Sequence, residues 1–292
     1  MKNFEYAAPA NVESATALLE KYGDAAKILA GGTDIIVQLR EGLRAADVVI
    51  DIKNIPEIVD YQYSADVGLQ LGAATPCYRI YGDEELAKAY PAVLDSTRII
   101  GGWQIQSRAS VGGNLCNASP AADSIPSLIA HQATCHIAGP HGRRSVAAQD
   151  FCTGPGRNTL EQGEMLVALT LPPSKPNSGS AYLRFIPRNE MDIAVVGAAS
   201  WVQLDDSGES IQSGRIALAA VAPVPLYAEE ASSWLSGQPA TAATFVEAGE
   251  LAKNIVSPIS DMRGTAEYRQ HLVGVLVKRT LKIAVERART NQ

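Results

Sequence analysis

The sequence predicts an α+β protein with a two-lobed first part and a second part that holds a small antiparallel sheet and helices. Three observations lead to this prediction. Helical and strand-like segments alternate in the first half, a proline-rich segment at residues 172–179 interrupts the chain, and strand-like segments are then followed by helical ones. Because proline and glycine clusters mark breaks between structural units, we place the boundary between residues 176 and 177.

The first lobe is expected to span residues 1–57. Asn11 is a typical N-cap for the first helix, and Gly23 is a typical stop signal for it. Residues 27–30 are predicted to form a strand, and the β-branched run at residues 48–52 predicts a buried strand. A lobe of about 57 residues lies near the lower limit for a stable core.

The second lobe is expected to span residues 58–176. Alternating or continuous apolar residues indicate strands here, and a proline at a first helical position indicates a helix start. The expected strands are residues 68–73, 133–138, 143–146 and 165–171, and the expected helices are residues 77–81, 83–90 and 91–100. Pro140-His141-Gly142, between two of these strands, predicts a hairpin turn.

The second part is expected to span residues 177–292. Asp205-Asp206-Ser207-Gly208 predicts a hairpin turn between two apolar strands, and the last helix carries apolar residues at helical spacing. The expected strands are residues 180–185, 193–204 and 214–221, and the expected helices are residues 228–235, 241–255 and 265–289. The pattern predicts a three-stranded antiparallel sheet beside a helical bundle.

Composition limits the classes of function. The 292 residues carry a net charge of −6 and no basic run, which makes a nucleic-acid partner unlikely to be recognised by charge. The first residues contain no apolar core of a signal peptide, and the most apolar runs are far too short to span a bilayer. We therefore expect a soluble cytoplasmic protein without a membrane span.

The sequence predicts no metal site and no catalytic acid–base or nucleophile arrangement. The cysteines at positions 77, 116, 135 and 152 form no Cys-x-x-Cys pair, so neither zinc nor an iron–sulfur cluster is expected in this chain. His131, His136 and His141 lie close in sequence, but no carboxylate completes a ligand set, and surface or hydrogen-bonded histidines are the simpler interpretation.

The most informative stretch runs from Ser110 to Asp123 and contains the pair Gly112-Gly113. Adjacent glycines let a backbone approach another group closely and reach positive φ. Ser119-Pro120 has the pattern of an N-cap followed by a first-turn proline, which predicts a helix start there. Amides at such a start, with short polar side chains nearby, suit an anion. An ordinary tight turn before a helix is the alternative.

A second glycine pair strengthens the binding hypothesis. In residues 28–35, an apolar strand runs into Gly31-Gly32, which Thr33 and Asp34 follow. Two such motifs suit a long ligand with a pyrophosphate in its middle. Neither motif matches the dinucleotide fingerprint Gly-x-Gly-x-x-Gly or the P-loop, so a Rossmann site is not indicated.

In their order and separation, these motifs resemble the flavoprotein (medium) subunit of the molybdenum hydroxylases, the family of carbon monoxide and xanthine dehydrogenases. The resemblance covers essentially the whole chain, including residues 101–108, 192–196 and 261–269. It implies a two-lobed FAD-binding domain of the type shared with vanillyl-alcohol oxidase (a PCMH-type domain), followed by a C-terminal flavoprotein domain. Thr33 and Asp34 stand where carbon monoxide dehydrogenases typically carry histidine and serine.

The resemblance also implies which residues bind FAD. The loop whose amides hold the pyrophosphate corresponds to Ile28, Leu29, Ala30, Gly31, Gly32, Thr33, Asp34 and Ile35. Phosphate and ribityl or ribose contacts correspond to Ser110, Gly113, Asn114 and Ser119, and the adenosine-binding carboxylate corresponds to Asp123. Further contacts correspond to Ile100, Leu169 and Arg184. A cation at position 184 would favour an anionic reduced flavin.

The function that the resemblance implies is electron transfer. Electrons would pass from [2Fe–2S] clusters of a small partner subunit to FAD in this chain and then to an external acceptor, after substrate oxidation in a large molybdopterin-binding subunit. The implied assembly is an αβγ heterotrimer, doubled to (αβγ)2. Two alternatives stay open: a stand-alone FAD oxidase of the vanillyl-alcohol type, and a scaffold subunit that kept the fold without the cofactor.

Overall fold

The computed structural model describes residues 2–291. Its first sheet contains three parallel strands in the order β1-β3-β2, namely β1 (Glu5–Ala7), β2 (Ala26–Leu29) and β3 (Val48–Asp51). Helix α1 (Val12–Tyr22) begins where predicted, because Asn11 Oδ1 accepts a hydrogen bond from Ser14 N at 2.8 Å. It ends at Gly23, whose φ of 52° suits glycine. The two predicted strands and the helix are confirmed, and β1 was missed.

The second sheet contains five antiparallel strands in the order β4-β5-β10-β6-β7. The strands are β4 (Tyr61–Ser64), β5 (Gly68–Gly72), β6 (Thr134–Gly139), β7 (Gly142–Ala147) and β10 (Met165–Leu171). All four strands predicted in this region are confirmed, as is the turn between β6 and β7. The sequence did not predict β4, an edge strand whose half-exposed residues lack an apolar run.

Short helices cover this sheet and connect the two lobes. They are α2 (Ile35–Arg40), α3 (Pro56–Val59), α4 (Cys77–Tyr81), α5 (Glu84–Ala89), α6 (Pro91–Thr97), α7 (Trp103–Gln106), α8 (Val111–Cys116), α9 (Ser124–Ala130) and α10 (Ala148–Phe151). A small hairpin of β8 (Cys152–Gly154) and β9 (Arg157–Asn158) and a 3-10 turn at Gly23–Ala25 complete the region. The predicted helices 77–81, 83–90 and 91–100 correspond to α4, α5 and α6.

The predicted helix start at Ser119-Pro120 is wrong. The N-cap of α8 is Ser110, whose extended backbone (φ −127°) lets its Oγ accept from Gly113 N at 3.1 Å. Gly112 and Gly113 therefore lie inside the helix and do not adopt positive φ. Ser119 and Pro120 lie in the turn after α8, and the next helix begins only at Ser124.

The C-terminal part contains a four-stranded antiparallel sheet rather than the predicted three strands. The strands are β11 (Ser178–Phe185), β12 (Val196–Leu204), β13 (Ile211–Ala219) and β14 (Leu226–Tyr227). The extra strand β14 has two residues and pairs with Ala217 and Leu218, so it has no periodicity of its own. The predicted helices correspond to α11 (Glu229–Trp234), α12 (Ala242–Ala252) with a 3-10 turn at Lys253–Ile255, and α13 (Ala266–Thr290).

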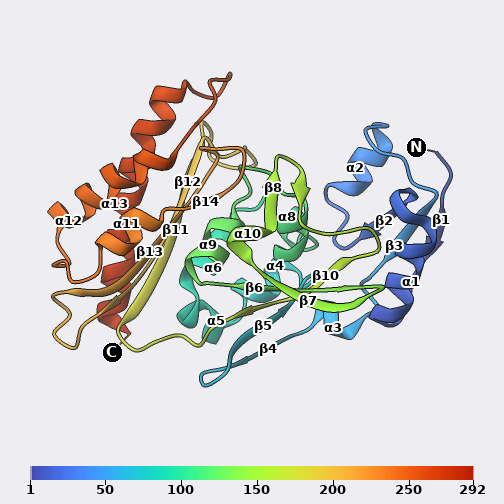
Figure 1. The fold of residues 1–292 in the computed structure, drawn as a ribbon, viewed down its shortest axis with the longest axis horizontal. Helices are drawn as coiled ribbons and strands as arrows, with labels where there is room; N and C mark the ends of the chain where they lie inside the picture. The colour runs from blue at the N-terminus through green and yellow to red at the C-terminus, as the bar shows by residue number, and fades with distance from the viewer. Residues whose placement is uncertain (1, 292) are drawn as a thin grey trace.

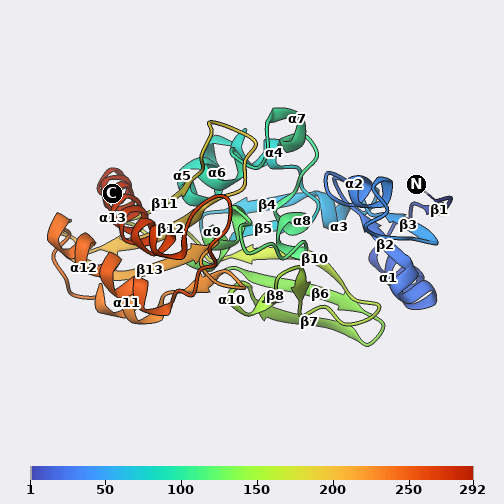
Figure 2. The same cartoon turned by 90° about the horizontal axis from the view of Figure 1, so that it is seen from above.

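The three sheets follow one another along the long axis of the molecule (Figure 1). The N-terminal sheet lies at one end, the five-stranded sheet lies in the middle, and the C-terminal sheet with α11, α12 and α13 lies at the other end. Seen from above, α13 packs on one side of β11 and β12, and α4, α6 and α7 lie above the middle sheet (Figure 2). One large apolar core joins the first two sheets, and a separate core lies between the last sheet and its helices.

Polar contacts fix the C-terminal part to the middle part. Arg287 forms a bidentate ion pair with Asp95 (2.6 and 3.0 Å), and the same Asp95 accepts from Tyr182 N. Ala220 N donates to Pro120 O at 2.7 Å. The junction between these parts is therefore held rigidly, next to the stretch that contains the second glycine motif. In the described residues, no helix combines the length and apolarity needed to cross a membrane.

Acid is expected to destabilise the protein through His131. Its ring is buried and Nε2 lies 2.9 Å from Ser180 Oγ; burial, with a smaller effect of Arg215, lowers its pKa to about 3. Since an unfolded histidine titrates near 6.5, the unfolded state binds more protons below that pH, and stability falls as pH drops toward 3. The expected loss between pH 6.5 and 5 is about 2 kcal/mol.

Urea unfolding at both pH values would measure this effect. A His131→Gln variant should lose most of the pH dependence, and His141→Gln, which changes an exposed histidine in the β6–β7 turn, should keep it. Equal pH dependence in the wild type and His131→Gln would contradict the assignment.

Candidate functional site

A cavity of about 450 Å³ lies where the first sheet meets the middle sheet. One wall is the loop that connects β2 to α2, and the opposite wall is the start of α8. The structure thus brings the two glycine motifs together, although about 80 residues separate them in sequence. The predicted binding residues that line the cavity are Ile28, Ala30, Gly31, Gly32, Thr33, Asp34, Ile35, Ile100, Ser110, Gly113 and Asn114.

Gly31 is the point at which the two motifs touch. A Cβ at this position would lie 2.0 Å from the backbone oxygen of Arg108, a distance that no side chain can tolerate. The contact is reciprocal, because Arg108 Nε donates to Gly31 O at 3.0 Å. Gly32, at φ 80°, then turns the chain into α2. Both glycines are therefore required by backbone geometry, and the loop they form is held by the segment that leads into α8.

In the second motif, Gly112 rather than Gly113 makes the close approach. A Cβ on Gly112 would lie 2.4 Å from Ala73 O, whereas a Cβ on Gly113 would meet only Ser110 Oγ at 3.0 Å. Gly112 thus seats α8 against the end of β5, and Gly113 leaves its backbone open toward the cavity. The glycine pair positions the helix and does not form a turn.

The polar side chains of α8 are partly engaged within the protein. Ser110 Oγ caps the helix, and Asn114 Oδ1 accepts from both the amide (3.2 Å) and the hydroxyl (2.6 Å) of Ser124. The Asn114 NH2 group makes no hydrogen bond to any residue in the described range 2–291 and remains available as a donor. This amide group and the neighbouring backbone N–H groups can face an acceptor in the cavity.

Five predicted binding residues do not line this cavity: Leu29, Ser119, Asp123, Leu169 and Arg184. Leu29 packs in a small cluster with Leu39 and Val49, and Leu169 is fully buried in the middle sheet. Ser119 lines a separate, mainly apolar cavity of about 290 Å³ beside Ile193 and Ala220. The last two, Asp123 and Arg184, contact each other.

Asp123 and Arg184 form a buried ion pair across the junction between the middle and C-terminal parts. Arg184 Nη1 donates to Asp123 Oδ2 at 2.6 Å, and Tyr182 Oη donates to Asp123 Oδ1 at 2.9 Å. Burial raises the pKa of Asp123 to about 6, although both partners act in the opposite direction. The carboxylate that was expected to accept from ribose hydroxyls is thus engaged by protein donors, and the Arg184 charge is locally offset.

The cavity extends further into the first lobe than the sequence indicated. Its far end has apolar walls from Leu19 and Ile28 on one side and Leu160 and Leu166 on the other. Polar residues at this end, which the sequence analysis did not select, are Asp24, Lys27, Gln38, Arg44, Asn158 and Glu164. They come from segments without a recognisable motif, so only their position in the fold identifies them.

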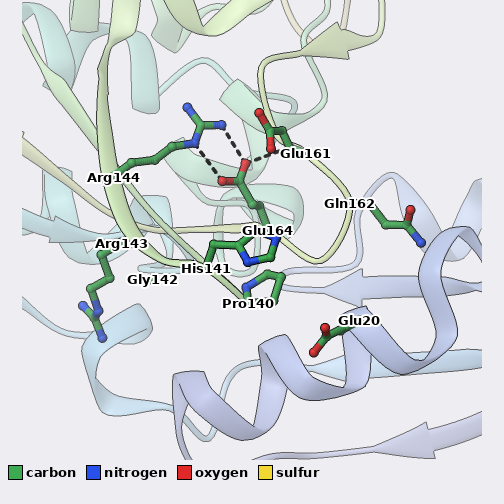
Figure 3. Close-up of a pocket in the computed structure, with 9 residues that line it drawn as sticks. All are labelled: Glu20, Pro140, His141, Gly142, Arg143, Arg144, Glu161, Gln162 and Glu164. Carbon is green, nitrogen blue, oxygen red and sulfur yellow. Dashed lines mark hydrogen bonds and ion pairs between the residues drawn. The ribbon is translucent and has the colours of Figure 1, made fainter.

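Glu164 also borders a second cavity, of about 460 Å³, on the outer side of the β6–β7 hairpin (Figure 3). Arg144 holds the Glu164 carboxylate through both oxygens, at 2.7 and 2.6 Å, and lowers its pKa. Glu161 N also donates to this carboxylate. Because these contacts occupy Glu164, the pair acts as a fixed wall between the two cavities.

Comparison with known proteins identifies the family. Residues 2–174 match the FAD binding domain in molybdopterin dehydrogenase, and residues 181–284 match the CO dehydrogenase flavoprotein C-terminal domain. The chain belongs to this flavoprotein family. It is accordingly an FAD-binding subunit of the molybdenum hydroxylase type, that is, part of an oxidoreductase.

Individual members of the family are similar over nearly their whole length. The xanthine dehydrogenase FAD-binding subunit of Escherichia coli O157:H7 is 33% identical over 264 residues, 90% of each chain. The carbon monoxide dehydrogenase medium chain of Afipia carboxidovorans is 33% identical over 287 residues, 98% of each chain. The crystal structure of a Cu,Mo-CO dehydrogenase matches with a TM-score of 0.92 at 32% identity, over 97% of this chain and 98% of that one.

The cavity fits the cofactor of this family. Gly31 gives a backbone loop that no larger residue could form, and Gly113 leaves the adjacent helix start open. The cavity is elongated, with polar groups in the middle and apolar walls at the first-lobe end, which suits a dinucleotide with a central pyrophosphate. Within residues 2–291, no group of three potential ligand side chains could hold a metal ion.

Proposed function

We propose that FAD lies in the cavity between the two glycine motifs, with its pyrophosphate against the Gly31-Gly32 loop. The observation that supports this placement is the contact between Gly31 and Arg108, because it fixes the loop opposite Ser110, Gly113 and Asn114. Backbone N–H groups from both motifs then face one volume, as an anion cradle requires. Ser119, Asp123, Leu169 and Arg184 remain proposed contacts that the cavity lining does not include.

The flavin half of FAD is proposed to extend toward the C-terminal part, and the AMP half toward the first lobe. Asn114 is hydrogen-bonded to Ser124, the residue after Asp123, so this end of the cavity leads to the Asp123–Arg184 pair. The opposite end has the apolar walls that a purine ring requires, from Leu19, Ile28 and Leu160. An electron donor or acceptor would then meet the flavin beside the junction of the two parts.

Bound FAD supplies the capacity to accept and release one or two electrons. The residues of this chain bind it, orient it and set its electrostatic surroundings. The Arg184 charge, which the sequence suggested as a stabiliser of an anionic flavin, is offset by Asp123 at 2.6 Å. We therefore expect the pair to position the flavin end and to contribute less net charge than a free arginine would.

Electrons are proposed to arrive from [2Fe–2S] clusters of a small partner subunit, after oxidation of a substrate at a large molybdopterin-binding subunit, in a cytoplasmic (αβγ)2 assembly. Several large apolar side chains near the junction support a permanent interface. Trp103 is 84% exposed and Met262 is 93% exposed, and Ile193 and Ile259 are also exposed. Obligate interfaces bury apolar surface of this kind.

The proposed domain division keeps residues 1–176 as the FAD-binding domain, with lobes of residues 1–57 and 58–176, and residues 177–292 as the C-terminal flavoprotein domain. The proline-rich link at residues 172–177 between β10 and β11 supports this boundary, because it joins two different sheets. The cofactor cavity then lies between the two lobes, and the Asp123–Arg184 pair lies between the two domains.

An absorbance spectrum of the purified chain, recorded before and after acid denaturation, tests the proposal. We expect a flavin spectrum, about one releasable FAD per chain and no iron, either as purified or after FAD is added. Flavin that stays covalently attached would instead favour a stand-alone oxidase. Absence of binding even with added FAD would favour a scaffold subunit and contradict the proposal.

A further inference from the structure

Two cations at the first-lobe end of the cavity, Lys27 and Arg44, have no counter-ion in the structure. Among residues 2–291, no carboxylate lies within ion-pair distance of either one. The Lys27 ammonium donates to the backbone oxygen of Asp24, which leaves two of its N–H groups free. Arg44 makes no hydrogen bond within the same range and is exposed.

Other arginines around the cavity are occupied, which sets these two cations apart. Arg108 donates to Gly31 O, and Arg144 holds Glu164 in a bidentate pair. Lys27 and Arg44, in contrast, lie close enough to repel one another. The pKa of Lys27 is lowered, first by burial and then by the charge of Arg44, and the nearby Asp24 opposes this effect only partly. An acceptor bound between the two cations would relieve their repulsion.

Their place in the fold separates them from the pyrophosphate loop. Lys27 lies on β2, four residues before Gly31, which corresponds to up to about 13 Å along a strand. Arg44 precedes Asp47, whose amide donates to Ala25 O at the start of the same strand. Both cations therefore lie beyond the loop, in the part of the cavity whose walls are Leu19, Ile28 and Leu160.

We propose that Lys27 and Arg44 bind the AMP half of FAD and thereby make the site select FAD over FMN. This inference rests on the proposed function. Adenine and ribose offer ring nitrogens and hydroxyl oxygens to the free N–H donors, and the AMP phosphate offers a negative charge within the range of a long guanidinium side chain. The guanidinium plane can also stack on a purine face. Asp24, at the same end, supplies an acceptor for the adenine amino group.

Flavin titrations of the full chain, followed by fluorescence quenching, test this inference. Lys27→Met and Arg44→Met should each weaken FAD binding about tenfold, and the double variant about a hundredfold, with no change for FMN. The control is Arg40→Met, which removes an equal charge from the same lobe. Arg40 is exposed, pairs with Glu41 and does not line the cavity. It should change neither affinity.

Displacement of FAD by AMP gives a second readout. The inhibition constant of AMP should rise about tenfold in each single variant and stay unchanged in Arg40→Met. An equal loss of FAD and FMN affinity, or an unchanged inhibition constant of AMP, would overturn the inference while leaving the proposed function intact. A wild-type chain that binds neither flavin would overturn the proposed function and this inference together.

Discussion

Gly31→Ala is expected to weaken FAD binding more than a hundredfold and to lower the stability of the chain. The added Cβ would lie 2.0 Å from Arg108 O, and because that atom belongs to the backbone, no side-chain rotation can relieve the clash. The loop or the segment before α8 must move, at a cost of roughly 3 kcal/mol or more. Since 1.4 kcal/mol corresponds to a factor of ten, the loss of affinity follows if the displaced loop no longer fits the pyrophosphate.

Gly42→Ala is the matched control for this prediction. Gly42 also lies in the first lobe, and a Cβ there would meet nothing within 4 Å, although its φ of 74° disfavours alanine. We expect a stability loss of about 1 kcal/mol and normal FAD binding. Thermal melts and FAD titrations of both variants separate the two effects. Normal FAD affinity in Gly31→Ala would show that the loop does not hold the cofactor.

Asp123→Ala is expected to cost about 3–5 kcal/mol of unfolding free energy, because it leaves the Arg184 charge buried without a partner. Both side chains are at most 10% exposed, so water cannot replace the lost carboxylate. Tyr182 would also lose the acceptor of its hydroxyl at 2.9 Å. Urea unfolding at pH 7.5 (above the Asp123 pKa of about 6) measures the change.

Two further variants test the reason for that loss. Tyr182→Phe removes only one hydrogen bond and should cost about 1 kcal/mol. In a double variant, Asp123→Ala with Arg184→Met, the unpaired charge is gone, and the combined loss should be smaller than the sum of the two single losses. Strict additivity would mean that the two side chains do not interact in solution as the 2.6 Å contact requires.

Much of the fold could be predicted from the sequence because its signals are local. Asn11 and Gly23 mark the two ends of α1, and continuous apolar runs mark β3, β10 and β12. Short strands at sheet edges were not predictable in this way. β1, β4 and β14 have two to four residues each and exist through pairing with a neighbour that is distant in sequence.

The helix start in the second glycine motif shows where local rules fail. Ser119-Pro120 and Ser110 both carry the residue type of an N-cap, and the sequence offers no means to choose between them. In the structure, Gly112 lies against the backbone of Ala73, and this contact seats the helix after Ser110. The choice is therefore made by packing on β5, about 40 residues earlier in the chain.

For the site, the sequence by itself determined the two glycine motifs, since backbone loops of this kind require glycine wherever the rest of the chain lies. The tertiary structure alone decided that Gly31 meets Arg108, that Asp123 is paired with Arg184, and that Lys27 and Arg44 face the same end of the cavity. The physical reason is that a charge is defined by its neighbours. Asp123 and Arg184 are 61 residues apart, and only the fold places them at 2.6 Å.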